Sequence, residues 1–153
     1  MKHPYAFTLL LGIGLLFGAG CQSNKETLLM GDFFTGNLVS YKNGKMDIIA
    51  SGFRGADAIE QDGDMLYVSS WPLGKVWSYN LATQERKELK GDFTTAADFY
   101  LDRAGKQLVV PDMLESKIHF LKLNDDGTAT MFKTLDAPSK PESVCRGFDG
   151  KLY

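Results

Sequence analysis

Short apolar runs separated by polar turns fill the chain after about residue 27, and none of them is long enough for an ordinary helix. Several runs alternate apolar and polar side chains, as residues 75–79 do, which is typical of a half-buried strand. Asn43-Gly44 is a strong hairpin signal, because both residues accept positive φ. Asp62-Gly63, Asp126-Gly127 and Asp149-Gly150 supply similar turns. We therefore expect an all-β protein with strands at 38–41, 46–50, 56–61, 65–69, 75–80, 85–90, 97–101, 107–111, 117–122 and 128–133.

The same order of runs returns about every 42 residues. Leu66, Leu108 and Leu152 are 42 and 44 residues apart, and Leu38, Val76 and Ile118 are 38 and 42 residues apart. Four short strands in each repeat are typical of β-propeller blades. We expect units at about 27–54, 55–95, 96–138 and 139–153, which make about three blades and the start of a fourth. The first unit begins with its second strand and the last stops inside its second strand, so we expect an N-terminal fragment of a longer propeller.

The first twenty-one residues have the order of an export signal. Lys2 and His3 precede an apolar stretch over 6–17, and Gly18, Ala19 and Gly20 then lead to Cys21. As a helix, twelve apolar residues span only about 18 Å, which is short of a membrane core of about 30 Å. Residues 1–20 are thus expected to be a signal peptide that is removed.

Small residues directly before a cysteine resemble the bacterial lipobox, which implies a lipid, including palmitate, on Cys21. Residues 21–26 would form a polar tether to a membrane. Gln22, in place of an aspartate, resembles the pattern of lipoproteins sent on to an outer membrane, which implies an outer-membrane or periplasmic location in the cell envelope. The alternative is a soluble secreted or periplasmic protein in which Cys21 is a free thiol or the disulfide partner of Cys145.

Charge and composition exclude some classes of function. The formal net charge is −2 and no basic run is present, so we expect no nucleic-acid partner. His119 is the single histidine after His3, which disfavours a site built from several histidine ligands or around a histidine base. Carboxylates must therefore carry any chemistry.

Residues 55–59, 62–68 and 74–77 resemble blades of the gluconolactonase and regucalcin-like six-bladed propellers, and propellers of the NHL type share much of this pattern. The resemblance implies six blades, which need about 250 residues, so the repeats of this chain would make about half of a ring. It also implies a central funnel where residues at the starts of the innermost strands bind one divalent cation. The matching residues are Asp57, Asp98 and Glu142.

Such an oxygen-only set suits calcium, magnesium or manganese. The resemblance further implies hydrolysis of a lactone or ester, with Asp57 or Asp98 as the candidate catalytic base. The family places glycine after each funnel residue, whereas Ala58, Phe99 and Ser143 stand here. The alternative is therefore open that Asp57 and Asp98 only cap backbone amides at the strand entry.

Several other side chains have two possible roles. Trp71 and Asp112 lie in loops after strands and are candidates for a surface pocket. Trp77 and Tyr79 share one face of a strand and are expected to pack between blades. His119 aligns with Trp77 and is expected to pack as well. Cys145 is expected to be a buried thiol.

The sequence thus predicts an envelope lipoprotein that binds a small molecule or glycan in its funnel, as a metal-dependent hydrolase or as a binding protein. The alternative is a non-catalytic scaffold that holds a protein or polymer partner near the membrane.

Overall fold

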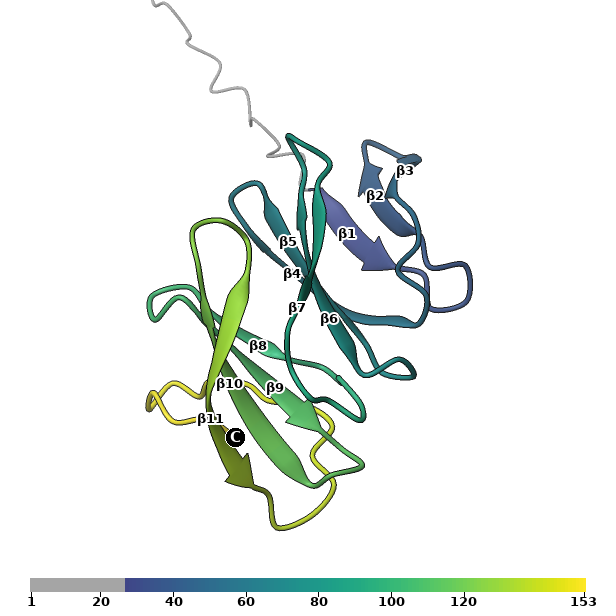
Figure 1. The fold of residues 1–153 in the computed structure, drawn as a ribbon. Coiled ribbons are helices and arrows are strands. Elements are labelled where there is room, and N and C mark those ends of the chain that lie inside the picture. The colour runs from purple at the N-terminus through teal and green to yellow at the C-terminus, as the bar shows by residue number, and fades with distance from the viewer. Residues whose placement is uncertain (1–26) are drawn as a thin grey trace, which may run out of the picture.

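The computed structural model describes residues 27–153, which form eleven strands and no helix. Within that range no helix is long and apolar enough to cross a membrane. The predicted signal peptide, Cys21 and the tether lie outside the described residues. The strands form three antiparallel sheets that follow one another in space, each twisted and open at its sides (Figure 1). This confirms the predicted all-β propeller blades.

The three sheets are called the first, second and third blades. The first has three strands in the order β1 (Leu28–Gly31), β2 (Leu38–Lys42) and β3 (Lys45–Ala50). The second has four, β4 (Ala56–Asp62), β5 (Met65–Ser70), β6 (Lys75–Asn80) and β7 (Arg86–Leu89). The third has β8 (Tyr100–Asp102), β9 (Gln107–Asp112), β10 (Lys117–Leu123) and β11 (Ala129–Asp136). As predicted, the first blade lacks an innermost strand.

Most strands and turns lie where the sequence predicts them. Asn43 and Gly44 both have positive φ, 55° and 79°, as the hairpin between β2 and β3 requires. The turn between β4 and β5 is shifted by one residue, because Asp62 pairs with Met65 and leaves Gly63-Asp64 as the turn. The first strand of the third blade starts only at Tyr100, three residues later than expected, and Asp98 before it makes an isolated bridge to Ser143.

Apolar side chains fill the two spaces between the three blades. Between the first and second blades, Trp77 and Tyr79 are buried around Phe53, whose ring meets theirs edge to face. The predicted packing role of Trp77 and Tyr79 is confirmed. Between the second and third blades a larger cluster brings Tyr67 and Val76 against Leu108, Val110 and Leu121. The second blade therefore packs one of its faces against the first blade and the other against the third.

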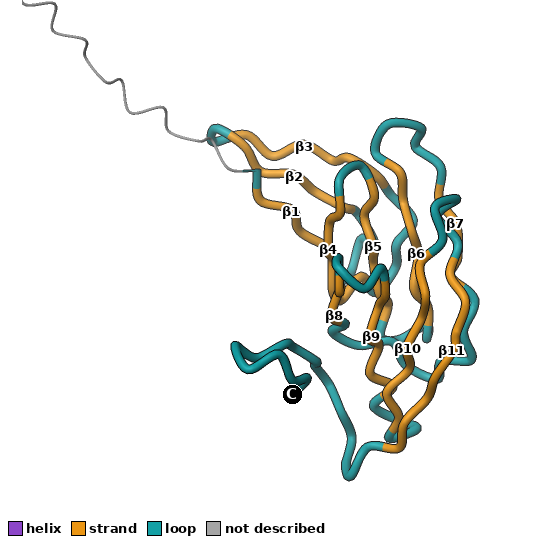
Figure 2. Tube along the Cα trace, turned by 90° about the vertical axis from the view of Figure 1, so that its left-hand side faces the viewer, coloured by secondary structure: helices purple, strands orange, loops and turns teal. Residues whose placement is uncertain are grey.

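Residues 139–153, called the fourth unit, contain no regular strand and run back beside β8 (Figure 2). Arg146 holds this unit to the third blade by an ion pair with Asp102 at 2.9 Å. Val144 is buried in a small cluster with Val109 and Phe120. Cys145 is exposed, so the prediction of a buried thiol is wrong. No strand of the fourth unit covers its side chain.

Different segments of the chain lie at the two ends of the blades. At one end, called the mouth end, β4 begins and the loop after β1 meets it, since the Gly55 N–H donates to the Phe33 carbonyl at 3.0 Å. At the opposite, hairpin end, the Leu81 N–H donates to the Asp64 carbonyl at 2.8 Å. Leu28 pairs with Tyr41 close to the hairpin turn of the first blade, so the chain enters β1 at the hairpin end.

Candidate functional site

The three predicted funnel carboxylates belong to successive inner segments of the blades. Asp57 is the second residue of β4, Asp98 lies just before β8, and Glu142 lies in the fourth unit. All three side chains are exposed. Because each segment enters its unit from the mouth end, the carboxylates gather on that side of the molecule.

Asp98 and the fourth unit are joined directly by their backbones. The Asp98 N–H donates to the Glu142 carbonyl at 3.0 Å, and the Val144 N–H donates to the Asp98 carbonyl at 3.3 Å. The resulting parallel bridge pairs Asp98 with Ser143, whose hydroxyl donates to Oδ2 of Asp98 at 2.9 Å. Two inner segments therefore run side by side, and the Asp98 carboxylate is oriented by its neighbour on the next unit.

Asp57 lies in the electrostatic field of the other two carboxylates. Partial desolvation raises the pKa of Asp57, and the negative charges of Asp98 and Glu142 raise it further. No cation among the described residues offsets these effects on Asp57. The ionised form of Asp57 is therefore disfavoured at the mouth of the funnel, an effect that a bound cation or a proton shared with a ligand would relieve.

The resemblance implied a bound cation, and the site offers the negatively charged carboxylate oxygens that such an ion prefers. Carboxylate oxygens are the ligands that hard divalent ions prefer. In residues 27–153, however, no three acidic, histidine or cysteine side chains are close enough together to hold one ion. Asp57, Asp98 and Glu142 are thus brought to one mouth and electrostatically coupled, but they do not by themselves form a coordination shell.

A groove lined by aromatic, aliphatic and cationic side chains opens at the mouth end, next to the start of β4. Its volume is about 320 Å³ and its lining residues are Phe33, Phe34, Arg54, Gly55, Pro72 and Leu73. Phe34 is 89% exposed, which is unusual for a large aromatic side chain. The predicted pocket residue Trp71 is 36% exposed and precedes Pro72, but it does not line this groove.

Phe33 and Phe34 were missed by the sequence reasoning, although a signal was present. Phe33 lies 38 residues before Trp71, the same spacing that relates Leu38 to Val76, and it occupies the corresponding loop. Like Trp71, Phe33 is an aromatic residue in a loop after a strand, which is the property that marks a candidate for a surface pocket.

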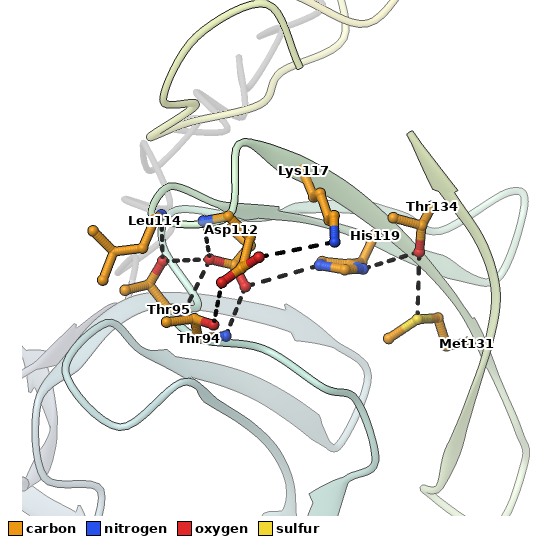
Figure 3. Close-up of polar contacts among 9 residues, drawn as sticks. Thr94, Thr95, Asp112, Leu114, Lys117, His119, Met131 and Thr134 are labelled. Carbon is orange, nitrogen blue, oxygen red and sulfur yellow. Dashed lines mark hydrogen bonds and ion pairs between the residues drawn. The ribbon is translucent and has the colours of Figure 1, made fainter. Parts of the chain in front are cut away.

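Asp112, the other predicted pocket residue, does not line a pocket. Its side chain is completely buried and binds the loop before β8 (Figure 3). Oδ2 accepts the Thr94 N–H at 2.7 Å, and Oδ1 accepts the Thr95 N–H at 3.1 Å and the Thr95 hydroxyl at 2.8 Å. The Glu115 N–H also donates to Oδ1 at 3.3 Å. Asp112 is therefore a structural link between the second and third blades, because it satisfies backbone donors of the segment that connects them.

His119 packs in the same interface, as predicted. It is 5% exposed, its ring meets Phe93 edge to face, and Nδ1 lies 3.1 Å from the Thr134 hydroxyl. Within residues 27–153, Nε2 has no hydrogen-bond partner, and it lies 3.9 Å from Oδ2 of Asp112 (Figure 3). Burial lowers the pKa of His119, and the nearby negative charge of Asp112 opposes that effect only in part.

Comparison with known proteins agrees with this geometry. No protein family and no curated protein matches the chain in sequence. Solved propeller-type structures do match it. They include a "putative 6-phosphogluconolactonase" from Bacteroides uniformis, with TM-score 0.64, 18% identity and coverage of 82% of this chain and 43% of that chain. They also include virginiamycin B lyase from Staphylococcus aureus, with TM-score 0.65, 14% identity and coverage of 85% and 45%.

The chain thus spans less than half the length of these two proteins. By contrast, the computationally designed protein Ika4, with TM-score 0.62 and 12% identity, is matched over 84% of both chains. At such low identities the likeness shows the β-propeller fold alone.

Proposed function

We propose that this protein is a propeller that binds a polar small molecule or glycan at the mouth of its funnel. The observation that carries the proposal is the gathering of Asp57, Asp98 and Glu142 at the mouth, where partial burial and then the two neighbouring negative charges raise the pKa of Asp57. This environment disfavours the ionised form of Asp57 in the free protein, and perturbed carboxylates of this kind are typical of functional sites.

The groove next to the start of β4 would supply the second half of a binding site, because its lining residue Gly55 lies two residues before Asp57. Exposed rings of Phe33 and Phe34 offer apolar faces on which a sugar ring or a lactone ring can stack, while Arg54 in the same lining offers donors to ring oxygens. Carboxylates on one side and aromatic rings on the other are the usual composition of a small-molecule site.

A metal-dependent hydrolysis of a lactone or ester is the finer form of this proposal. A divalent cation, when bound, would polarise the carbonyl of the ligand and acidify a water. Asp57 is the residue placed to accept a proton in such a reaction, because its raised pKa makes it a stronger base than an ordinary aspartate. Asp98, oriented by the Ser143 hydroxyl, would offer a carboxylate oxygen to the cation, which would need further ligands beyond the three carboxylates.

Calorimetric titration of the full chain with calcium or manganese tests the cation. Asp57→Ala and Asp98→Ala are expected to abolish binding, whereas Asp64→Asn at the hairpin end, an exposed carboxylate of the same blade, should leave it unchanged. A wild-type protein that binds neither ion, or binds them equally well after both substitutions, refutes the cation. Release of acid from γ- and δ-lactones and from aryl esters then separates hydrolysis from binding alone.

The exposed aromatic rim also favours a second candidate, a scaffold that binds a protein or polymer partner. Trp71, Leu73 and Phe34 are 36%, 42% and 89% exposed at the same end. A photoreactive residue at position 34 would crosslink in cells to one macromolecule if the scaffold is correct, and the same crosslink should survive Asp57→Ala. Loss of the crosslink in Asp57→Ala would instead favour the funnel.

We also propose that Cys21 carries a lipid that anchors the protein in the cell envelope. The chain enters β1 at the hairpin end, so a tether before residue 27 would leave the mouth end facing away from the membrane. Metabolic labelling with palmitate should give a labelled wild type and an unlabelled Cys21→Ser variant. Equal labelling of both would exclude Cys21 as the acceptor.

A further inference from the structure

A pocket of about 180 Å³ opens between the second and third blades at the hairpin end, on the side of the molecule away from the mouth. It lies among the turns that follow β4, β8 and β10, and both blades that form it have four strands. We call it the hairpin pocket. Its polar lining includes Asp62, Tyr67, Lys106 and Asp125, and its apolar lining includes Met65 and Leu123.

The hydroxyl of Tyr67 is an unpartnered polar group in this pocket. Tyr67 is 5% exposed, and its side chain packs in the cluster between the two blades. Within residues 27–153 the hydroxyl makes no hydrogen bond, and burial together with the negative charge of Asp62 raises the pKa of Tyr67. The hydroxyl is therefore a neutral O–H group that can donate or accept. A tyrosine buried to this degree usually finds a partner for its hydroxyl, so the group is available to a ligand.

The Tyr67 oxygen is reached through the hairpin pocket. In the part of the chain that the structure describes, Nε2 of His119 is the one side-chain nitrogen or oxygen that is both sealed from solvent and without a hydrogen bond. The unpaired Tyr67 oxygen is thus not sealed, and the open space that its side chain lines is this pocket.

The charged groups of the hairpin pocket favour a positively charged donor. Asp62 acts through its charge on both Tyr67 and Lys106, but it is hydrogen-bonded to neither of them. The Lys106 ammonium group is already engaged, because it pairs with Asp125 at 2.8 Å. A ligand therefore meets a free carboxylate and a free hydroxyl, and the single lysine of the lining does not neutralise both carboxylates.

A smaller pocket of about 60 Å³ adjoins the hairpin pocket. The two pockets share Met65, Asp125 and Gly127. The adjoining pocket adds Glu85, Lys87 and Asp126. Lys87 is engaged as well, since its ammonium group donates to the Asp126 carbonyl at 2.6 Å and pairs with Glu85 at 3.5 Å. Together the two pockets are lined by four carboxylates and two lysines, which gives a formal net charge of −2.

Contacts between the second and third blades fix the walls of both pockets. Next to Asp62 in the chain, the Arg103 guanidinium donates to the Gln61 carbonyl at 2.6 Å and pairs with Glu60 at 3.0 Å. At the shared wall, the Ser78 hydroxyl donates to the Gly127 carbonyl at 2.5 Å. The turns are therefore held in place without a ligand, which lowers the cost of binding one.

We propose that the hairpin pocket and the adjoining pocket together bind a linear aliphatic diamine. One ammonium group lies between the Asp62 carboxylate and the Tyr67 hydroxyl and donates to both. The alkyl chain passes along Met65, which both pockets share, and the second ammonium group reaches the carboxylates of Glu85 and Asp126. Two positive charges on the ligand then match the formal charge of the lining. This site lies at the opposite end of the blades from the mouth and is independent of the function proposed there.

Calorimetric titration of the full chain with putrescine tests the proposal, with butylamine as a ligand of single charge and butanediol as a neutral one. We expect putrescine to bind, butylamine to bind roughly fivefold more weakly because it lacks one partly exposed ion pair, and butanediol not to bind. Asp62→Asn should also weaken putrescine binding roughly fivefold. Asp47→Asn, an exposed carboxylate of the first blade, is the matched control and should leave binding unchanged.

Tyr67→Phe is the sharpest variant, because it removes the hydroxyl and keeps the buried ring. It should weaken putrescine binding about tenfold, the size of one hydrogen bond to a charged group. Its melting temperature should not fall, since the hydroxyl has no partner within residues 27–153.

Three results would overturn the proposal. The first is a wild type that does not bind putrescine, or that binds butanediol as tightly. The second is binding that Tyr67→Phe and Asp62→Asn leave unchanged. The third is binding that is kept in Asp62→Asn and lost in Asp57→Asn, which would place the amine at the mouth of the funnel.

Discussion

Replacement of Asp112 by alanine should destabilise the propeller more than any other loss of a single carboxylate. Asp112 is completely buried, and it accepts hydrogen bonds from the backbone of Thr94, Thr95 and Glu115 and from the Thr95 hydroxyl. In Asp112→Ala these donors remain and their acceptor is gone. The cost is therefore set by how many of them water can reach.

Thr95 is buried, so its N–H and hydroxyl stay unpaired, at about 1–3 kcal/mol for each donor. Thr94 and Glu115 are exposed, so water can replace part of their bonds. We expect a total loss of about 3 kcal/mol, a large fraction of the ~5–15 kcal/mol that stabilises an ordinary domain. Asp112→Asn keeps one oxygen, which can still accept the bonds made to Oδ1, and should cost about half as much.

Urea unfolding of the full chain, followed by tryptophan fluorescence, measures both variants. With a slope of roughly 1–3 kcal/mol per molar urea, the midpoint of Asp112→Ala should fall by about 1–3 M. Asp125→Ala is the matched control, because the Asp125 side chain is 92% exposed and only pairs with Lys106 on the surface. If Asp112→Ala unfolds at the same urea concentration as Asp125→Ala, the buried network does not hold the blades together.

Three further predictions concern single side chains. Burial lowers the pKa of His119, so the unfolded chain takes up the proton first and stability should decline as the pH falls below about 6.5. In His119→Gln the urea midpoint should therefore change less between pH 7 and pH 5 than it does in the wild type. The raised pKa of Asp57 means that its ionised form is disfavoured in the fold, so Asp57→Asn should raise the melting temperature at pH 7 by a small amount, limited by solvent screening, and Asp64→Asn should not. Gly74 has φ +56° and an added Cβ would meet the Phe93 carbonyl oxygen, whereas Gly63 has φ +57° and open space around it; in thermal melts Gly74→Ala should therefore lose roughly 1 kcal/mol more than Gly63→Ala.

The blades were predictable because the same pattern of strands and turns recurs along the chain and depends mainly on neighbouring residues. A two-residue turn with positive φ at Asn43 and Gly44, and alternation along β6, are decided by neighbouring residues alone. The start of β8 was not predictable, because Asp98 pairs with Ser143, 45 residues away, instead of with its own blade. The exposed position of Cys145 has the same origin, since burial there depends on a neighbouring sheet and not on the local pattern.

The candidate site shows the same division between local and long-range information. Repeat spacing places Asp57, Asp98 and Glu142 at equivalent starts of inner segments, and equivalent starts must face one axis, so their gathering at the mouth follows from the sequence. Whether they converge on one ion depends on the angle between blades and on how many inner segments share the mouth. Three segments surround only part of a funnel, so partial burial and the charges of Asp98 and Glu142 raise the pKa of Asp57 although the three carboxylates form no coordination shell. Inner segments of further blades would bring more polar groups to the same axis, so the ligand chemistry of this mouth depends on residues from several blades and cannot be deduced from the pattern of any one of them.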